Sequence, residues 1–441
     1  MQKLTHFTQT SWKAGISRVI ITPDQPMWMA GYDSRVHPVE GTLHELWAKA
    51  LVLEDSKGKQ AVLVTIDVLG VPKRISDLIR DELHARFGLN KSQIILNSSH
   101  THSGPVLENA LTSIYPFDDV HREQISEYSR LFITHIISLV SKAFENIIPV
   151  NLYSQNGVAR FQVNRRNNSE AVLDEQIELK GPNDYAVPVI KVESISGETL
   201  AIVFGYACHN TVLDIYKWSG DYAGFAQIEL ENEYPGSIAM FFQGAGGDQN
   251  PLPRRTVALA KQYGKTLAAA VGSVLEEEMN PIEAVLTTNY SEIKLHLEKP
   301  PSEEELNNIV ETSTSFEGRC AEHLLKRIRS GEFFDLTYDY PLQVWHLGSQ
   351  PIISMGGEVV IEYAVKLKQI FGKDLFIMAY SNDLMGYIPS AVILHEGGYE
   401  GDSSQMVYGL PGKWKEGIEE QILQEVVKLA EEAGVQKKVS T

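Results

Sequence analysis

The chain has 441 residues, of which 43% are hydrophobic and 22% are charged, as is typical of a globular protein with a large buried core. Its 39 basic and 57 acidic residues give a net charge of −18, which argues against binding to nucleic acid or to anionic membrane surfaces. Two cysteines are too few for a disulfide framework, and no stretch is long and apolar enough to predict stable membrane insertion.

The organisation of the chain predicts one globular unit. The first ten residues contain no apolar segment of the secretory type, so we expect a cytoplasmic protein, although a processed secreted form would show the same terminus. No repeat or Pro/Ser-rich linker interrupts the sequence, and residues 1–441 are therefore expected to form a single domain. Nothing in the sequence predicts an oligomeric state.

Short apolar runs alternate with longer amphipathic ones, an order that predicts an α/β fold with a mixed β-sheet core flanked by helices. Strands are predicted at Ile16–Ile21, Leu46–Leu53, Ala61–Thr65, Gln93–Leu96, Val187–Val192, Leu200–Tyr206, Ile238–Phe242, Ala284–Leu297, Leu342–Leu347 and Leu375–Ala379. Helices are predicted at Lys73–Phe87, His121–Asn146, Ala223–Tyr234, Val257–Glu277, Ser302–Ser330, Glu358–Phe371 and Lys415–Ala433.

The first chemical motif is a His-x-His pair that follows the apolar run Gln93–Leu96. Side chains two apart on a strand point to the same face. If extended geometry continues past Leu96, His100 and His102 therefore point into one space. Neutral imidazoles suit Zn²⁺, so the pair is a candidate metal site; the alternative is two polar histidines in a loop.

A second histidine, His209, follows the strand Leu200–Tyr206, at the type of strand end where α/β proteins place functional groups. The alternative is a histidine satisfied within the core. Cys208 precedes it, but neighbours on a strand face opposite ways, so the two are not expected to share a metal.

Glycine-rich segments follow further strands. Gly246 and Gly247 belong to a cluster after Ile238–Phe242 whose amides could line a pocket for an anion or an oxyanion; the alternative is a tight turn. Glu358 follows two glycines at the predicted start of a helix, where the dipole stabilises a carboxylate. Tyr399 lies in another glycine-rich loop, where most tyrosines serve packing.

Several segments, taken together, resemble the neutral (non-lysosomal) ceramidase family. The similarity covers roughly residues 14 to 410, in the order found in the family. It rests on Ala14-Gly15-Ile16, Met29-Ala30-Gly31-Tyr32, Ser99-His100-Thr101-His102-Ser103-Gly104-Pro105, Asn164-Arg165, the His209 segment, Ser219-Gly220-Asp221, Asn382-Asp383-Leu384-Met385-Gly386-Tyr387-Ile388-Pro389 and Gly398-Tyr399-Glu400.

The resemblance implies a zinc-dependent enzyme that cleaves the amide of N-acyl sphingosine. Its implied metal ligands are His100, His209, Glu358 and Tyr399, and the family pattern disfavours the alternative in which His100 and His102 both bind. The remaining implied residues are His102, which would face the substrate, Arg165 with its neighbour Arg166, which match the arginine that holds the reacting group, and Tyr408, the nearest candidate for a further family tyrosine.

Two departures from the family pattern bear on the substrate. Asn250 replaces the family's active-site serine, so proton transfer to the leaving amine would pass to His102, Tyr408 or Asp221. The chain also shows neither the secretory signal nor the carboxy-terminal immunoglobulin-like domain of ceramidases, so the substrate need not be a lipid.

Three interpretations follow. The first is a zinc hydrolase that cleaves an amide of a small N-acyl substrate with metal-activated water, with Gly246, Gly247 and Asn250 among the substrate-binding residues. The second keeps the zinc site but acts on an ester, a lactone or a glycoside, because Asn250 stands in place of serine. The third is a non-catalytic binding protein that the metal stabilises.

Overall fold

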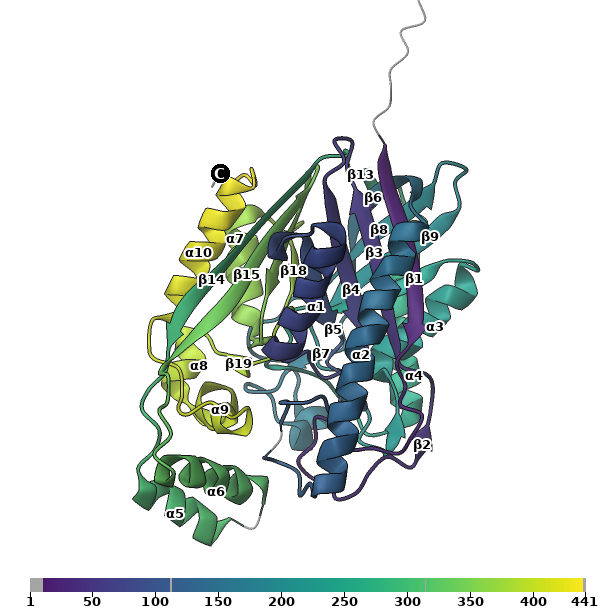
Figure 1. Cartoon of the computed structure of the whole chain (residues 1–441). Helices are drawn as coiled ribbons and strands as arrows, with labels where there is room; N and C mark the ends of the chain where they lie inside the picture. Colours follow the sequence, from purple (N-terminus) through teal and green to yellow (C-terminus); the bar gives the residue numbers. More distant parts are fainter. Residues whose placement is uncertain (1–10, 112, 314, 439–441) are drawn as a thin grey trace, which may run out of the picture.

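The computed structural model describes residues 11–111, 113–313 and 315–438, and its largest element is a nine-stranded sheet (Figure 1). The strand order is β11-β9-β8-β6-β1-β3-β4-β5, with β13 paired to β6. Most neighbours are antiparallel, whereas β4 with β5 and β9 with β11 are parallel. The strands are β1 (Trp12–Ile20), β3 (Trp47–Glu54), β4 (Gln60–Ile66), β5 (Ile94–Ser98), β6 (Ile148–Val158), β8 (Ala186–Ser194), β9 (Thr199–Tyr206), β11 (Ile238–Gln243) and β13 (Asn280–Pro281).

A second sheet has the order β14-β15-β16-β18. Its strands are β14 (Leu286–His296), β15 (Thr337–Leu347), β16 (Gln350–Met355) and β18 (Phe376–Met378). Three short pairs complete the strands: β2 (Gly41–Thr42) with β10 (Lys217–Trp218), β7 (Gln162–Asn164) with β12 (Gln249–Pro251), and β17 (Glu358–Val359) with β19 (Tyr387–Ile388).

The two sheets bury a common apolar layer between them. Side chains alternate along each strand, so Val203 of β9 faces this layer while Ile202 and Phe204 face helices on the other side. The second sheet contributes Trp345 and Phe376 to the same layer. The alternating pattern thus places helices on the outer face of each sheet.

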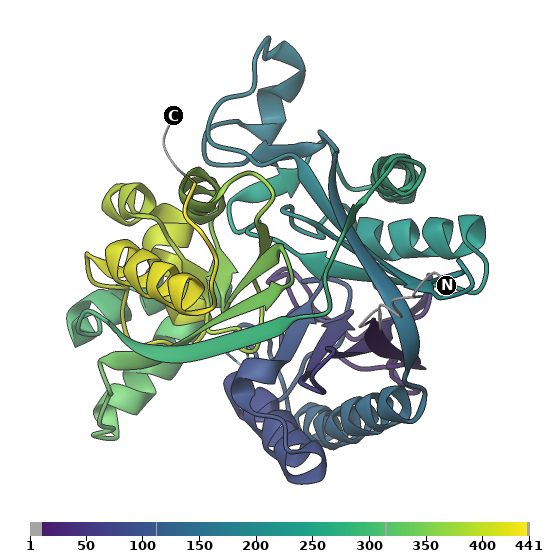
Figure 2. The ribbon, with the colours of Figure 1, turned by 90° about the horizontal axis from the view of Figure 1, so that it is seen from above.

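Helices cover those outer faces, as the view from above shows (Figure 2). Helix α2 packs over β1 and β3, and α1 packs beside α2 in the apolar cluster that includes side chains of β4 and β5. Helices α3 and α4 pack over β6, β8 and β11, and α7 and α10 lie on the second sheet. Their bounds are α1 (Lys73–Phe87), α2 (Asp119–Glu145), α3 (Asp221–Glu233), α4 (Val257–Leu275), α7 (Ile361–Phe371) and α10 (Ile418–Glu432); the shorter helices are α5 (Glu303–Thr312), α6 (Phe316–Arg329), α8 (Ala391–Glu396) and α9 (Ser404–Val407). The predicted α/β class is confirmed. No helix within the described ranges is long and apolar enough to cross a membrane.

Two predicted helices differ from the structure, and one long strand was not predicted. The helix predicted at Ser302–Ser330 is two helices, because α5 ends at Thr312 and the Ser315 side chain caps the first turn of α6. The helix predicted from Glu358 begins at Ile361, since Glu358 pairs in β17. The eleven-residue strand β6 was missed because its second half, Ser154–Val158, is polar and glycine-containing.

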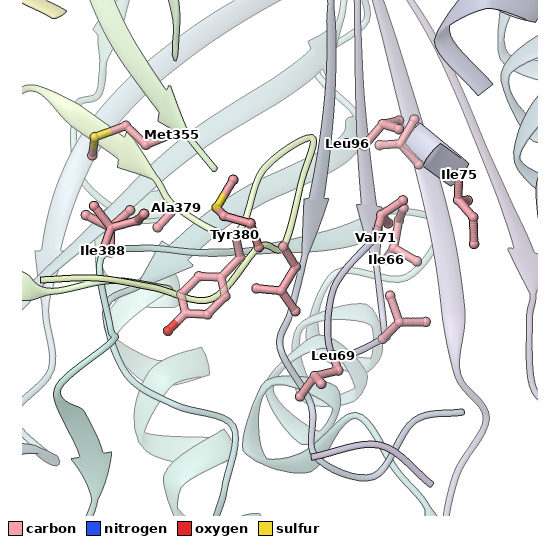
Figure 3. Close-up of a cluster of buried hydrophobic side chains, with 14 of the residues drawn as sticks. Ile66, Leu69, Val71, Ile75, Leu96, Met355, Ala379, Tyr380 and Ile388 are labelled. Carbon is pink, nitrogen blue, oxygen red and sulfur yellow. The ribbon is translucent and has the colours of Figure 1, made fainter. Parts of the chain in front are cut away.

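A buried apolar cluster joins the two sheets next to the loops described below. Figure 3 shows Leu96 and Ile66 on one side of this cluster and Met355 and Ile388 on the other, with Tyr380 between them. The contact holds the ends of β5 and β16 in fixed positions relative to one another. Side chains on the following loops are therefore held in place by rigid elements.

Candidate metal centre and active site

Three loops that leave strand ends bring His100, His209 and Glu358 together. His100 follows β5, His209 follows β9, and Glu358 lies in the two-residue strand β17 just after β16. The Nε2 atoms of His100 and His209 lie 3.2 and 3.1 Å from the same Glu358 oxygen, Oε2, and all three side chains are 1% exposed. The structure thus brings together three of the four ligands that the resemblance implied.

The contact that Nδ1 makes determines the tautomer of each imidazole. Nδ1 of His100 lies 2.7 Å from the carbonyl oxygen of Leu69, and Nδ1 of His209 lies 2.7 Å from that of Gly246. A carbonyl only accepts, so each Nδ1 carries a proton, and in the neutral imidazole each Nε2 then directs a lone pair at Glu358. Three acceptors then face one another, an arrangement that is favourable only with a cation or a proton between them.

His102 completes a cluster of three imidazoles. Its Nε2 is 3.1 Å from Nε2 of His100, and one nitrogen of each of His100, His102 and His209 lies within 4.8 Å of the others. The expectation that the histidine pair shares one space is confirmed, but the expected extended backbone is wrong. β5 ends at Ser98, and His100 has a left-handed φ of 58°.

Burial and neighbouring charges set the ionisation of the cluster. Burial, aided by the Arg165 charge, lowers the pKa of His209 to about 4, and burial and the other imidazoles lower the pKa of His102 well below its usual value. Burial raises the pKa of Glu358, but His100 and His209, when protonated, lower it well below its usual range through their charge and their hydrogen bonds. Neutral imidazoles and a carboxylate are the forms in which these residues bind Zn²⁺.

Two tyrosines contact this cluster directly. The Tyr408 hydroxyl donates to Oε1 of Glu358, the oxygen that the histidines do not contact. The Tyr387 hydroxyl lies 3.4 Å from Nε2 of His209 and accepts from Arg165 at 3.0 Å. Tyr387 was quoted only as part of the family resemblance, and its position between an arginine and a histidine was not predicted.

Tyr399 lies beside the cluster without a described bond to it. Its ring centroid is 5.4 Å from that of Tyr387, and the residue is 42% exposed. Burial of its hydroxyl and the nearby Glu358 charge raise its pKa, so its phenolate form would need a cation nearby. Its role as a fourth ligand stays a prediction.

Glu400 holds the two arginines that the sequence singled out. Its Oε1 is 2.7 Å from Nε of Arg165, and its Oε2 is 2.7 Å from Arg166. Arg165 also reaches the side-chain oxygen of Asn250, at 3.4 Å. Burial lowers the pKa of Arg165, but Tyr387 and Glu400 more than offset this, so its positive charge is fixed beside His209. Glu400 was missed although it follows Tyr399 in a quoted segment.

The glycine cluster does not offer the anion pocket that was expected. The amide of Gly246 donates to the carbonyl of Gly244 and that of Gly247 to the carbonyl of Val359, so neither is free for an oxyanion. Gly246 instead orients His209 through its carbonyl. A Cβ at position 247 would lie 2.7 Å from the Glu358 carbonyl oxygen, so glycine there permits the close approach of the two loops.

Two buried aspartates support the loops of the site. Asp221 accepts from the backbone amides of Val212 and Leu213, at 3.2 and 2.8 Å, and is not among the described residues that line the cavities beside the cluster. This placement orders the loop after His209 and does not bring Asp221 to the cluster. Asp248, to which no role was assigned, accepts from the amide of Ile361 at 2.9 Å and so fixes the start of α7.

Two cavities adjoin the cluster. The larger has a volume of about 990 Å³ and the smaller about 190 Å³. His102, Tyr387 and Tyr399 line both. A substrate that spans the two cavities would therefore place its central bond next to His102.

A sequence model described as "Neutral/alkaline non-lysosomal ceramidase, N-terminal" matches residues 12–261. The chain belongs to this family. Neutral ceramidases B and A of Dictyostelium discoideum are 26% and 27% identical to it over 248 and 271 residues, which is 51% and 56% of this chain. The aligned parts are only 33% and 36% of those relatives, about a third of their length.

The fold of this family member matches that of a solved ceramidase. The crystal structure of neutral ceramidase from Pseudomonas aeruginosa superposes with a TM-score of 0.73 at 16% identity, over 98% of this chain and 76% of that chain. The structure titled "Ceramidase complexed with C2" also gives a TM-score of 0.73, at 15% identity. These comparisons confirm the resemblance and the predicted fold class.

Proposed function

We propose that this ceramidase-family protein is a zinc-dependent hydrolase that cleaves the amide C–N bond of an N-acyl substrate. The observation that carries the proposal is the convergence of the Nε2 atoms of two buried imidazoles on one carboxylate oxygen, with Nδ1 of each imidazole held by a backbone carbonyl. The names of the relatives, neutral ceramidases, support an amide as the bond.

The donor set fits zinc, which binds histidine nitrogen and carboxylate oxygen with four ligands and keeps one position open in catalytic sites. His100, His209 and Glu358 would hold the ion, with Tyr399 as the further ligand. Zinc bound there would act as a Lewis acid and would lower the pKa of a bound water to about 7.

The chain's own residues would orient the amide and stabilise charge on its oxygen. His102 faces the cluster with Nε2, and the Arg165 guanidinium is fixed nearby by Glu400 and Tyr387. A preorganised donor to a developing oxyanion contributes roughly 3 to 4 kcal/mol in other hydrolases.

Proton transfer to the leaving amine falls to His102 in this arrangement. Its Nε2 lies at the cluster, and burial keeps the imidazole neutral, so it can take up a proton and then pass that proton to the leaving amine. The Tyr408 hydroxyl is already engaged by Glu358, and Asp221 is held away from the cluster by backbone amides.

The test combines metal analysis with a turnover screen. We expect the purified protein to contain stoichiometric zinc and to hydrolyse N-acyl amines, N-acyl amino acids or a short-chain ceramide. His100→Ala and Glu358→Ala should abolish both zinc uptake and turnover. His346→Ala is the matched control, because His346 lies on β15 with Nδ1 3.0 Å from the Ala433 carbonyl, outside the cluster. A His100→Ala protein with full zinc and full activity would contradict the assignment.

Esters, lactones and glycosides belong in the same screen. Asn250 stands where the family has a serine, and it contacts Arg165 at the large cavity. Turnover of one of these classes without any amide cleavage would show that the enzyme cleaves that class of bond and not an amide. Zinc binding without turnover of any class would favour the binding-protein interpretation.

A further inference from the structure

The large cavity beside the cluster is positively lined, although the whole chain is acidic. Two glutamates, Glu170 and Glu400, line it together with four arginines, whereas the chain carries a net charge of −18. A local excess of positive charge in a concave site attracts anions whatever the overall charge. The four arginines are Arg165, Arg166, Arg254 and Arg255.

Of these four arginines, Arg255 has the longest contact with a carboxylate, so its N–H donors are the most available to a ligand. Arg165 and Arg166 are held by Glu400, and Arg254 lies 2.9 Å from Glu170. The nearest carboxylate to Arg255 within the described residues is that of Asp214, at 3.6 Å, and its side chain is 37% exposed. A guanidinium has five N–H donors in a planar fork that matches a carboxylate.

One tyrosine connects Arg255 to the cluster. The Arg255 guanidinium donates to the Tyr32 hydroxyl at 2.9 Å and lies 5.0 Å from the centroid of its ring. The same ring is 4.8 Å from that of His102. The Tyr32 ring would therefore separate an anionic group bound by Arg255 from a substrate bond placed at His102.

The small cavity, which His102 also lines, is limited in size and has mixed walls, with apolar side chains on part of its lining and Asp33, Glu358 and three tyrosines on the rest. Its walls include Leu69, Leu111, Ile114 and Phe316, and its volume is about 190 Å³. An apolar protein cavity of about 150 Å³ accommodates benzene. The part of this space that Leu69, Leu111, Ile114 and Phe316 line thus suits a short group of about six carbons.

We propose that the preferred substrate is a water-soluble amide with a short apolar group on one side and a carboxylate on the other. The carboxylate contacts Arg255 in the large cavity, and the apolar group occupies the small cavity. This inference rests on the proposed amide hydrolysis and specifies its substrate class.

Matched substrates test the charge requirement on the zinc-loaded protein. N-hexanoylglycine carries the carboxylate on the amine side, N-hexylsuccinamic acid carries it on the acyl side, and N-isobutylhexanamide is a neutral counterpart of similar shape. We expect kcat/KM for one of the two acids to exceed that of the neutral amide by about tenfold or more, the scale of one exposed charge-assisted hydrogen-bond pair. The preferred acid identifies the side of the amide that faces Arg255.

Arg255→Gln should lower kcat/KM for the preferred acid by about tenfold more than it lowers kcat/KM for the neutral amide. Arg160→Gln is the control, because it removes an equal charge from an exposed residue that does not line the cavity. Equal turnover of acids and neutral amide, with no effect of Arg255→Gln, would overturn the inference while the proposed function stands.

A binding measurement separates this inference from the proposed function. The probe is the ketone analogue of N-hexanoylglycine, in which a methylene replaces the amide nitrogen, together with its neutral counterpart, both titrated calorimetrically. Preferential binding of the acid that Arg255→Gln weakens supports the inference even if no amide is cleaved. Equal binding of both ketones to both proteins would overturn it.

Discussion

Tyr408→Phe should weaken zinc binding without disturbing the metal ligands themselves. The Tyr408 hydroxyl donates to Oε1 of Glu358, while Oε2 faces the two histidines. A hydrogen bond to a charged group contributes about 1.5 to 3 kcal/mol, and loss of a partner that orients a ligand typically costs about 10- to 100-fold in metal affinity. We therefore expect the zinc Kd to rise about 10- to 100-fold.

The assay is competition for zinc against a chromophoric chelator at neutral pH, repeated as thermal unfolding at fixed excess zinc. A 100-fold weaker Kd removes about 2.7 kcal/mol of the stabilisation by bound zinc. Tyr338→Phe is the control, because its hydroxyl also donates to a buried carboxylate, Asp383, at 2.6 Å, away from the histidines. Unchanged affinity in Tyr408→Phe, or an equal loss in Tyr338→Phe, would refute the reasoning.

Two further variants test other parts of the structure. Gly31 has φ +108°, and a Cβ there would lie 2.4 Å from Cγ of His102, so Gly31→Ala should displace this ring. We expect zinc content to be retained and turnover to fall about 100-fold, as on loss of an oxyanion donor; normal turnover would remove His102 from the reaction. Burial raises the pKa of Asp383 from 3.8 to about 7. The protonated carboxyl therefore favours the folded state, and this stabilisation is complete below about pH 4 and is lost as the pH rises to about 7. In urea unfolding, the stability of Asp383→Asn relative to the parent should therefore rise by about 3 kcal/mol between roughly pH 5 and pH 8; a constant difference would contradict the shifted pKa.

Local pattern was sufficient for most of the secondary structure. The helix predicted at Lys73–Phe87 has the observed bounds, because its apolar residues recur at helical spacing and Gly88 ends it in a left-handed conformation. The local pattern gave the wrong element where a tertiary contact determined the structure. Glu358 was expected in a helix but pairs with Tyr387 in a two-stranded ladder. Strand pairing of this kind depends on a partner far along the chain, which no local window contains.

The candidate site divides in the same way. The amino-acid sequence by itself determined which groups are available, including the imidazoles at 100, 102 and 209 and the carboxylate at 358, and it identified the family to which they belong. Only the tertiary structure decided that these groups share one space, since the loops that carry them are held by the contact between two sheets. It also decided the direction of the lone pairs, because backbone carbonyls of distant segments occupy the other imidazole nitrogens. Arg255 was not singled out from the sequence at all, since its remaining capacity for an anion depends on which carboxylates the fold places beside each arginine.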